Sequence, residues 1–342
     1  MVQGMATEAS TTPATGRVVW RRYLAKPTQE QIVLLVTLAL IIGFSVALPG
    51  FAAVANLLNL AKSVSILGIL GLGMAIVVIA RGLDLSQVAI MAVSLGIALT
   101  LMTNGVSTPV ALLAVLVLAL AIGAINGLII AFIEVPALFA TLATTFVAFG
   151  LGRLVLRTLF IYAPPTATGL FFIGQGRILG IPTPIVIFAA AALIVHWMLS
   201  RTSLGRFLYA HGDNPEAARL TGVAVRPLAV IQYMLSALLA WVAGIVFTGS
   251  TASMNLQIIY STAIFDTILV VVLGGVSLIG GRGGVLSIIA GTALIGTLLN
   301  GFTIMDVNSE VQNIIKGVVL LAAILLDNRL HPRDDETARQ GD

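Results

Sequence analysis

Residues 64 to 80 read VSILGILGLGMAIVVIA, a run of apolar and small side chains without a single charge. A bilayer core of about 30 Å needs about 20 such residues in a helix, with a usual range of about 17 to 25. The run therefore predicts a membrane-spanning helix. Its glycines, Gly68, Gly71 and Gly73, loosely resemble the glycine-rich fingerprint of dinucleotide-binding proteins, but no strand precedes them as that motif requires. We expect them to serve close helix packing instead.

The rest of the chain has the same character. Of its 342 residues, 58% are hydrophobic and 9% charged, and the mean hydropathy is +1.08, whereas soluble domains carry about 25% charge. Apolar runs recur from residue 32 to 326, and no polar segment between them is long enough to fold separately. We predict an all-α polytopic membrane protein with one membrane domain, 32–326, and two tails, 1–31 and 327–342.

Composition also excludes several kinds of site. There is no cysteine, which excludes disulfides, thiolate metal sites and cysteine nucleophiles. His196 and His211 lack metal-ligand spacing, so we expect no metal site. The net charge of +4 is spread among loops and does not form a basic stripe, so no nucleic-acid partner is expected.

Ten runs are long enough to be candidate spans. They lie at 32–48, 64–80, 86–103, 110–133, 136–156, 185–200, 228–248, 263–279, 285–300 and 311–326. The first could be a signal peptide, but its polar leader of about 30 residues favours an uncleaved helix. RGLDLSQ at 81–87 and LGGVSLIGGRGG at 273–284 interrupt the pattern. Either could mark a broken or re-entrant helix, which is tolerated where protein surrounds it.

Orientation follows from the basic residues, because Lys and Arg are enriched in cytoplasmic loops. With ten spans and the N-terminus inside, 13 of the 18 Lys and Arg face the cytoplasm. Both tails and the loop 201–227 are then cytoplasmic. The loop from 157 to 184, rich in proline and glycine, supplies most of the outer face.

The internal loop 201–227 carries an unusual share of the charge. At about 2.5 to 3.5 kcal/mol for each Arg or Asp at the bilayer centre, it cannot lie in lipid. Asp213 or Asn214 can cap a helix, Pro215 suits its first position, and Gly222 can end it in the left-handed conformation. The sequence predicts about two turns of helix outside the membrane, which could dock in a groove of another protein or could be merely interfacial.

EAARLTG at 216–222 resembles the E-A-A-x-x-x-G motif of ABC importer permeases, although the apolar I-x-L-P tail of the maltose-type branch is absent. The chain is more similar to ribose/xylose-type sugar permeases over roughly residues 55 to 327. This similarity rests on GLDLS (82–86), VPALFATLATT (135–145), LGRFLYAHGDNPEAARLTGV (204–223), VVLGGVSLIGGRGG (271–284) and GTLLNG (296–301). One departure is Arg81, where the family usually has glycine.

The resemblance implies a ten-helix permease with two related halves in a bacterial inner membrane, commonly a homodimer. It implies an ATPase partner, which would use the ATP and Mg, and a periplasmic sugar-binding protein, while this chain needs no cofactor. The ATPase contact carried over comprises Asn214, Pro215, Glu216, Ala217, Ala218, Arg219 and Gly222. Internal evidence for two halves is faint, an NG pair at 126–127 and again at 300–301.

Polar residues within the spans are candidates to line a translocation pathway. Asp266 is the first, because ionisable residues inside a membrane are functional candidates by default; it could equally cap a helix. The others are Asn126, Thr141, Thr144, Thr145, Gln257 and Asn300, which could bind sugar hydroxyls or bond across helices. Asp84, followed by Ser86, is expected to cap the third span.

Three function classes remain in comparison. An ATP-driven importer subunit for a monosaccharide, a pentose or hexose, or a related polyol is favoured. An ion-coupled secondary transporter of a small polar solute would need deep ionisable residues, and Asp266 is almost the only one. An intramembrane enzyme would need clustered carboxylates, which the loops lack. GGRGG at 280–284 lacks the Lys-Ser/Thr of a phosphate loop, so the chain is expected to have no ATPase or other enzyme activity of its own.

Overall fold

The computed structural model describes residues 28–330, so the predicted tails lie almost entirely outside the described residues. Each of the ten predicted spans coincides with a helix. The helices are α1 (Gln29–Ala47), α2 (Val54–Ile79), α3 (Gln87–Thr103), α4 (Thr108–Phe132), α5 (Ala137–Leu156), α7 (Thr183–Arg201), α10 (Val225–Thr251), α11 (Ala263–Gly274), α12 (Val285–Ile304) and α13 (Ser309–Leu330). Among the described residues, 7 helices are long and apolar enough to cross a membrane, whereas α3 and α11 are apolar but shorter.

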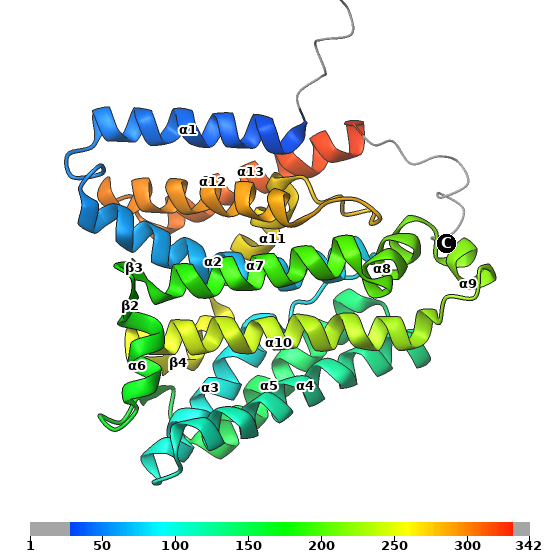
Figure 1. Cartoon of the computed structure of the whole chain (residues 1–342), viewed down its shortest axis with the longest axis horizontal. Coiled ribbons are helices and arrows are strands. Elements are labelled where there is room, and N and C mark those ends of the chain that lie inside the picture. Colours follow the sequence, from blue (N-terminus) through cyan, green and yellow to red (C-terminus); the bar gives the residue numbers. More distant parts are fainter. Residues whose placement is uncertain (1–27, 331–342) are drawn as a thin grey trace, which may run out of the picture.

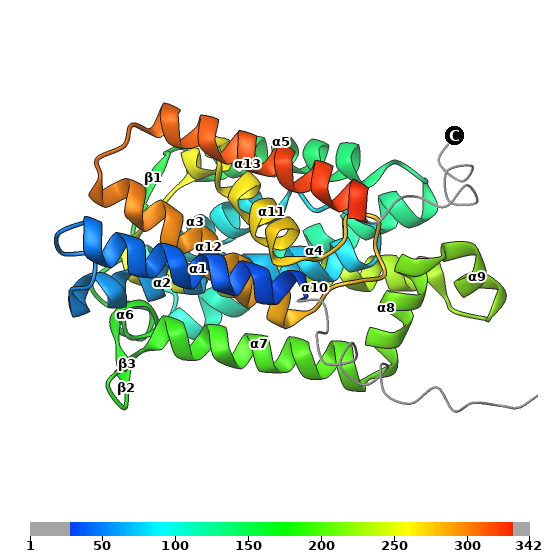
Figure 2. The ribbon, with the colours of Figure 1, turned by 90° about the horizontal axis from the view of Figure 1, so that it is seen from above.

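The remaining elements gather at the two ends of the long helices (Figure 1). At one end lie α6 (Thr168–Gln175) and two antiparallel strand pairs, β1 (Phe160–Tyr162) with β4 (Ser253–Asn255) and β2 (Arg177–Ile178) with β3 (Ile181–Pro182). The 3-10 helix η2 (Leu256–Tyr260) follows β4. At the opposite end lie α8 (Ser203–Asp213) and α9 (Pro215–Leu220). The start of α1 and the end of α13 point toward this second end (Figure 2).

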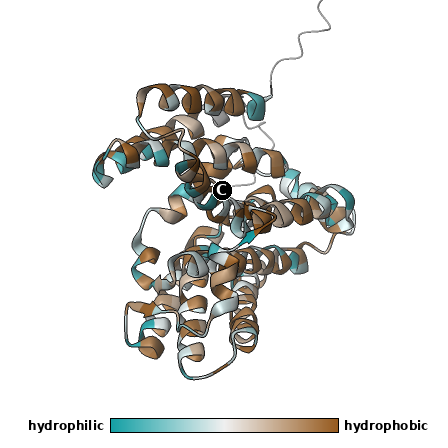
Figure 3. Ribbon diagram, turned by 60° about the vertical axis from the view of Figure 1, so that its left-hand side comes forward, coloured by the Kyte–Doolittle hydropathy of each residue, from teal (hydrophilic) through white to brown (hydrophobic). Residues whose placement is uncertain are grey.

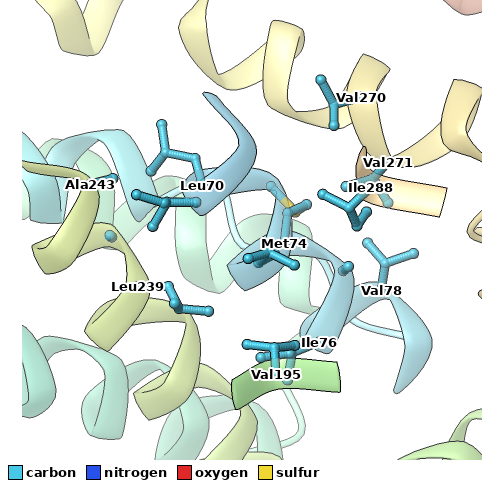
Figure 4. Packing of buried hydrophobic residues seen from close by; sticks show 14 of the residues in the cluster. Leu70, Met74, Ile76, Val78, Val195, Leu239, Ala243, Val270, Val271 and Ile288 are labelled. Atoms are coloured by element: carbon cyan, nitrogen blue, oxygen red, sulfur yellow. The ribbon is translucent and has the colours of Figure 1, made fainter. Parts of the chain in front are cut away.

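The quoted run forms most of α2, the most buried of the candidate spans, with 72% of its apolar window inside the protein. A Cβ on Gly68 would lie 2.5 Å from the Phe188 ring of α7, and one on Gly73 would lie 2.6 Å from Gln87 of α3. Gly71 faces Val270 of α11 in the same way. The three glycines therefore serve helix packing, as predicted. Figure 4 shows the surrounding core, in which side chains of α2 meet those of α7, α10, α11 and α12.

Small residues also set the contact between α4 and α10. A Cβ on Gly127 would lie 2.4 Å from the Val230 Cα, and one on Gly123 would lie 2.6 Å from the Tyr233 carbonyl oxygen. The backbones approach closely at these glycines because no side chain separates them. α10 thereby becomes a second central helix, and it carries several polar side chains into the core.

Two boundaries differ from the predicted spans by about five residues or more. α2 begins at Val54, so the polar residues Asn56, Asn59 and Lys62 belong to the helix that was predicted to start at 64. α11 ends at Gly274 and not at 279, because Gly275 adopts a φ of 102°. The segment 275–284 is then irregular, in agreement with the predicted interruption. Figure 3 shows that hydrophobic residues dominate the helices.

Candidate functional site

The loop 201–227 folds into two short helices. Thr202 caps α8 by accepting a hydrogen bond from the Gly205 amide (3.3 Å). Asn214 caps α9, since its Oδ1 accepts from the Ala217 amide (3.0 Å), and Pro215 takes the first helical position. α9 ends at Leu220, and Gly222 has a φ of +87°. The start and stop signals therefore act as predicted, with Asn214 as the cap.

α9 presents most of its side chains outward. Glu216, Ala217 and Arg219 are exposed, while Ala218 is buried against the rest of the protein. The Leu220 side chain is 88% exposed, a large apolar group at the tip of the molecule. Leu220 stands at an unspecified position of the E-A-A-x-x-x-G motif, so the motif did not single it out. Its exposure beside Glu216 and Arg219 gives α9 a mixed apolar and charged outer face.

A cavity of about 580 Å³ lies behind α9, between it, the end of α4 and the start of α10. Its lining includes His211, Arg219 and Arg226. Burial, and next the nearby charge of Arg81, lower the pKa of His211, so this imidazole is neutral at neutral pH. Arg226 pairs with Glu134 at 3.2 Å, but both side chains are well exposed, and such a pair contributes little stability.

Arg81 links the loop 201–227 to the end of α2. Its Nε donates to the Gly212 carbonyl (2.8 Å) and the Ile279 carbonyl (2.9 Å), and its Nη2 donates to the Asp213 carbonyl (2.9 Å). The Arg81 backbone is left-handed, with a φ of 63°, which costs a non-glycine residue about 1–2 kcal/mol. A left-handed backbone favours glycine, the residue that the family resemblance led us to expect here. The three hydrogen bonds give this arginine a function that glycine lacks.

Residues 82–86 form a buried polar junction between α2 and α3. Asp84 is fully buried: its Oδ1 accepts from the Ser86 amide (3.0 Å) and hydroxyl (2.5 Å), and its Oδ2 from the Ser236 hydroxyl of α10 (2.6 Å). Gln87 donates to Ser236 (2.7 Å) and Asn126 to Ser86 (2.8 Å). The expected cap of α3 is absent, since no side chain caps this helix. Asp84 instead joins the helices around it.

Three of the predicted pathway residues belong to this junction. The Asn126 amide donates to Ser86, and the Thr145 hydroxyl donates to the Leu85 carbonyl (3.1 Å). Thr141 accepts from the Leu85 amide (3.2 Å) and donates to its own helix at the Ala137 carbonyl (2.8 Å). All three are buried. They hold helices together here, which is the alternative that the sequence left open for them.

Two other predicted pathway residues, Asp266 and Asn300, line a cavity of about 440 Å³ between α2, α3, α10, α11 and α12. Asn59, Ser63 and Thr303 add amide and hydroxyl groups to an otherwise largely apolar wall. The Asn300 and Asn56 side chains exchange two hydrogen bonds (2.9 and 3.0 Å). We call this space the chamber. Such volumes and linings are typical of small-ligand sites.

Asp266 does not face the chamber as a free charge. The Lys316 Nζ of α13 lies 2.9 Å from its Oδ1, and also donates to the Thr262 hydroxyl (2.7 Å). Both charged side chains are nearly buried, at 12% and 13% exposure. The carboxylate is therefore neutralised by a cation from another helix, which also ties α13 to α11.

The last two predicted pathway residues lie elsewhere. Thr144 lines an apolar groove of about 750 Å³ among α3, α4 and α5, whose other lining residues are hydrophobic or glycine. Gln257 is exposed in η2. The structure therefore divides the seven candidates among four places, and it brings only Asp266 and Asn300 together in one cavity.

Comparison with known proteins finds relatives over most of the chain. Residues 56–324 match the family model described as a branched-chain amino acid transport system / permease component. The chain is 37% identical to the ribose import permease protein of Escherichia coli, covering 92% of this chain and 99% of that protein. It is 36% identical to the ribose import permease protein of Bacillus subtilis, covering 85% and 90%, and 33% identical to the galactose/methyl galactoside import permease protein of Escherichia coli, covering 88% and 94%.

The comparison with solved structures found no match. The family match covers most of the chain, and it includes both α9 and the chamber. The chain therefore belongs to the family of branched-chain amino acid transport system permease components.

Proposed function

We propose that this chain is the membrane-spanning translocation subunit of an ATP-driven importer, and that it carries a monosaccharide or related polyol into a bacterial cell. The observation that carries this proposal is α9, a capped helix that projects Glu216, Arg219 and Leu220 from one end of the molecule. A short rigid helix outside the membrane can receive movement from a partner ATPase. ATP and Mg would be bound by that partner.

The chamber supports a neutral polyol as the solute. Its volume of about 440 Å³ exceeds what one pentose or hexose needs, and its polar groups are amides and hydroxyls beside apolar side chains. Lys316 cancels the charge of Asp266, so the wall offers hydrogen bonds without a net charge. The relatives named for ribose and galactose import point to the same solute class.

The proposed topology places α8, α9 and both tails, 1–31 and 327–342, in the cytoplasm of a bacterial inner membrane. The start of α1 and the end of α13 point toward the α9 end, which supports this arrangement. The opposite end, with α6 and the strand pairs, would face a periplasmic sugar-binding protein. A second copy of the permease completes the assembly proposed from the family resemblance.

An ion-coupled secondary transporter is the alternative. Such proteins need an ionisable side chain that can take up the coupling ion. Asp266 is paired with Lys316, and Asp84 accepts hydrogen bonds at both oxygens. Both carboxylates are already engaged, which disfavours this mechanism. Uptake by the purified chain alone, driven by a proton or sodium gradient, would favour it.

The docking assignment is tested by uptake of radiolabelled ribose and galactose into vesicles that contain the permease, its ATPase and its binding protein. Glu216→Lys reverses the charge on the outer face of α9, and Gly222→Trp places a large side chain at a left-handed position. Both are expected to reduce ATP-dependent uptake to background while the permease stays in the membrane. Gly222→Asn is the matched control, because asparagine tolerates this backbone. ATP-dependent uptake retained by both disruptive variants would refute the assignment.

A further inference from the structure

We propose that Arg81 is the positioning residue that passes movement of α9 to the buried Asp84 junction, an inference that rests on the proposed function. Arg81 lies two positions after the last residue of α2, and only two residues separate it from Asp84. At Arg81 the segment contacts the loop 201–227, and at Asp84 it contacts the core helices. Movement of either must displace the segment between them.

On the docking side, Arg81 engages the end of α8. The Gly212 and Asp213 carbonyls belong to the last turn of that helix, where carbonyls lack partners within the helix and attract cations. The guanidinium satisfies both, and its bond to the Ile279 carbonyl adds the segment 275–284. Asn214 follows directly and caps α9, so only this one residue separates the end of α8 from the start of α9.

The backbones around the Arg81 hydrogen bonds are tightly packed. A Cβ on Gly212 would lie 1.8 Å from the Ile79 carbonyl oxygen, and one on Gly280 would lie 2.5 Å from the Arg81 Cγ. The Gly281 amide donates to the Ile79 carbonyl (2.8 Å), and the Tyr209 hydroxyl donates to the Gly283 carbonyl (2.7 Å). These contacts hold together the end of α8, the end of α2 and the segment 275–284. Close-packed interiors transmit strain, so displacement of one of these segments displaces the others.

On the core side, the segment reaches four helices within a few residues. Asp84 accepts from Ser236 of α10, Ser86 accepts from Asn126 of α4, and Thr145 of α5 donates to the Leu85 carbonyl. α3 begins at Gln87. A continuous path of hydrogen bonds and backbone therefore runs from α9 through Arg81 to α3, α4, α5 and α10, and such contiguous contacts are a physical means of coupling distant sites.

The inference is tested in the complete complex by measuring sugar transported per ATP hydrolysed. Arg81→Lys keeps the charge, but its single ammonium nitrogen cannot take the positions of both Nε and Nη2. Arg81→Gly removes the side chain and also the left-handed strain. In both variants we expect assembly and ATP hydrolysis within about twofold of wild type, while sugar transported per ATP falls by about tenfold, an ordinary size for a coupling effect.

Arg157 provides the matched control, because it is also left-handed, with a φ of 56°, and exposed. Among the residues that the structure describes, its side chain forms no hydrogen bond or ion pair. Arg157→Gly should leave the transport ratio unchanged. An unchanged ratio in both Arg81 variants would overturn the inference, as would equal loss of hydrolysis and uptake in an assembled complex.

A complex in which Arg81→Gly does not assemble leaves Arg81→Lys to decide by the same ratio. Failure of wild-type uptake with both partners present would count against the proposed function itself. The two failures are therefore distinguishable, because the inference concerns the ratio in variants of an active complex.

Discussion

The Asp84 junction and the Asp266 chamber each place one carboxylate among apolar helices, yet they are built in opposite ways. Asp84 is held by hydroxyl and amide donors and is fully buried. Asp266 is held by a lysine and borders a space of about 440 Å³. One aspartate therefore connects closely packed helices, and the other lines a cavity.

This difference shows that polar residues in a membrane bundle fall into two groups, those that connect helices and those that line a cavity. Most buried hydroxyl and amide groups find a hydrogen-bond partner, so polar side chains gather around a buried carboxylate. The packing of the surrounding helices then decides whether such a polar cluster connects helices or lines a cavity. Substitutions that separate stability from uptake test the division.

The largest expected effect is that of Asp84→Ala on stability. The change removes the acceptor of two hydroxyls and one amide, and each unsatisfied buried group costs about 1–3 kcal/mol. We expect a loss of roughly 3–5 kcal/mol, seen as a lower midpoint of thermal unfolding in detergent and a poor membrane yield. Ser94→Ala is the control, because the buried Ser94 hydroxyl has no partner among the described residues. An unfolding midpoint unaltered by Asp84→Ala would contradict the junction.

Lys316→Met should affect uptake more than folding. It leaves Asp266 as an unpaired charge at the chamber wall, and we expect uptake to fall about tenfold, equivalent to about 1.4 kcal/mol. The double variant Asp266→Asn with Lys316→Met removes both charges, and such neutral pairs are often tolerated. It should recover uptake to within about threefold of wild type. If the double variant were as inactive as the single one, Lys316 would have a role beyond neutralising Asp266.

Sequence patterns predicted the helices well, because apolar length is a direct requirement of the bilayer. They also predicted the cap and end of α9, since these depend on local residues such as Asn214 and Gly222. They did not predict where α2 begins, because a polar residue such as Asn56 looks unfavourable in a span until its partner is known. Asn56 is satisfied by Asn300, which lies 244 residues away.

The pathway residues were harder to predict for the same reason. Thr141, Thr144 and Thr145 lie within five positions of one helix, and nothing in the local sequence separates them. In the structure, two contact the segment 82–86 and the third faces an apolar groove. Their roles depend on which helices pack against each face of α5, and that is a property of the whole fold.

The smallest predicted effect compares these neighbours. Thr145→Val keeps the shape but removes the donor to the Leu85 carbonyl, and we expect a loss of about 1 kcal/mol in the free energy of unfolding. Thr144→Val removes a hydroxyl that faces the apolar groove, so its effect should lie within about 0.5 kcal/mol of zero. Thermal unfolding of both variants in the same detergent measures the difference. Equal destabilisation by the two changes would show that residues 82–86 do not depend on α5, and the junction would then be limited to α3, α4 and α10.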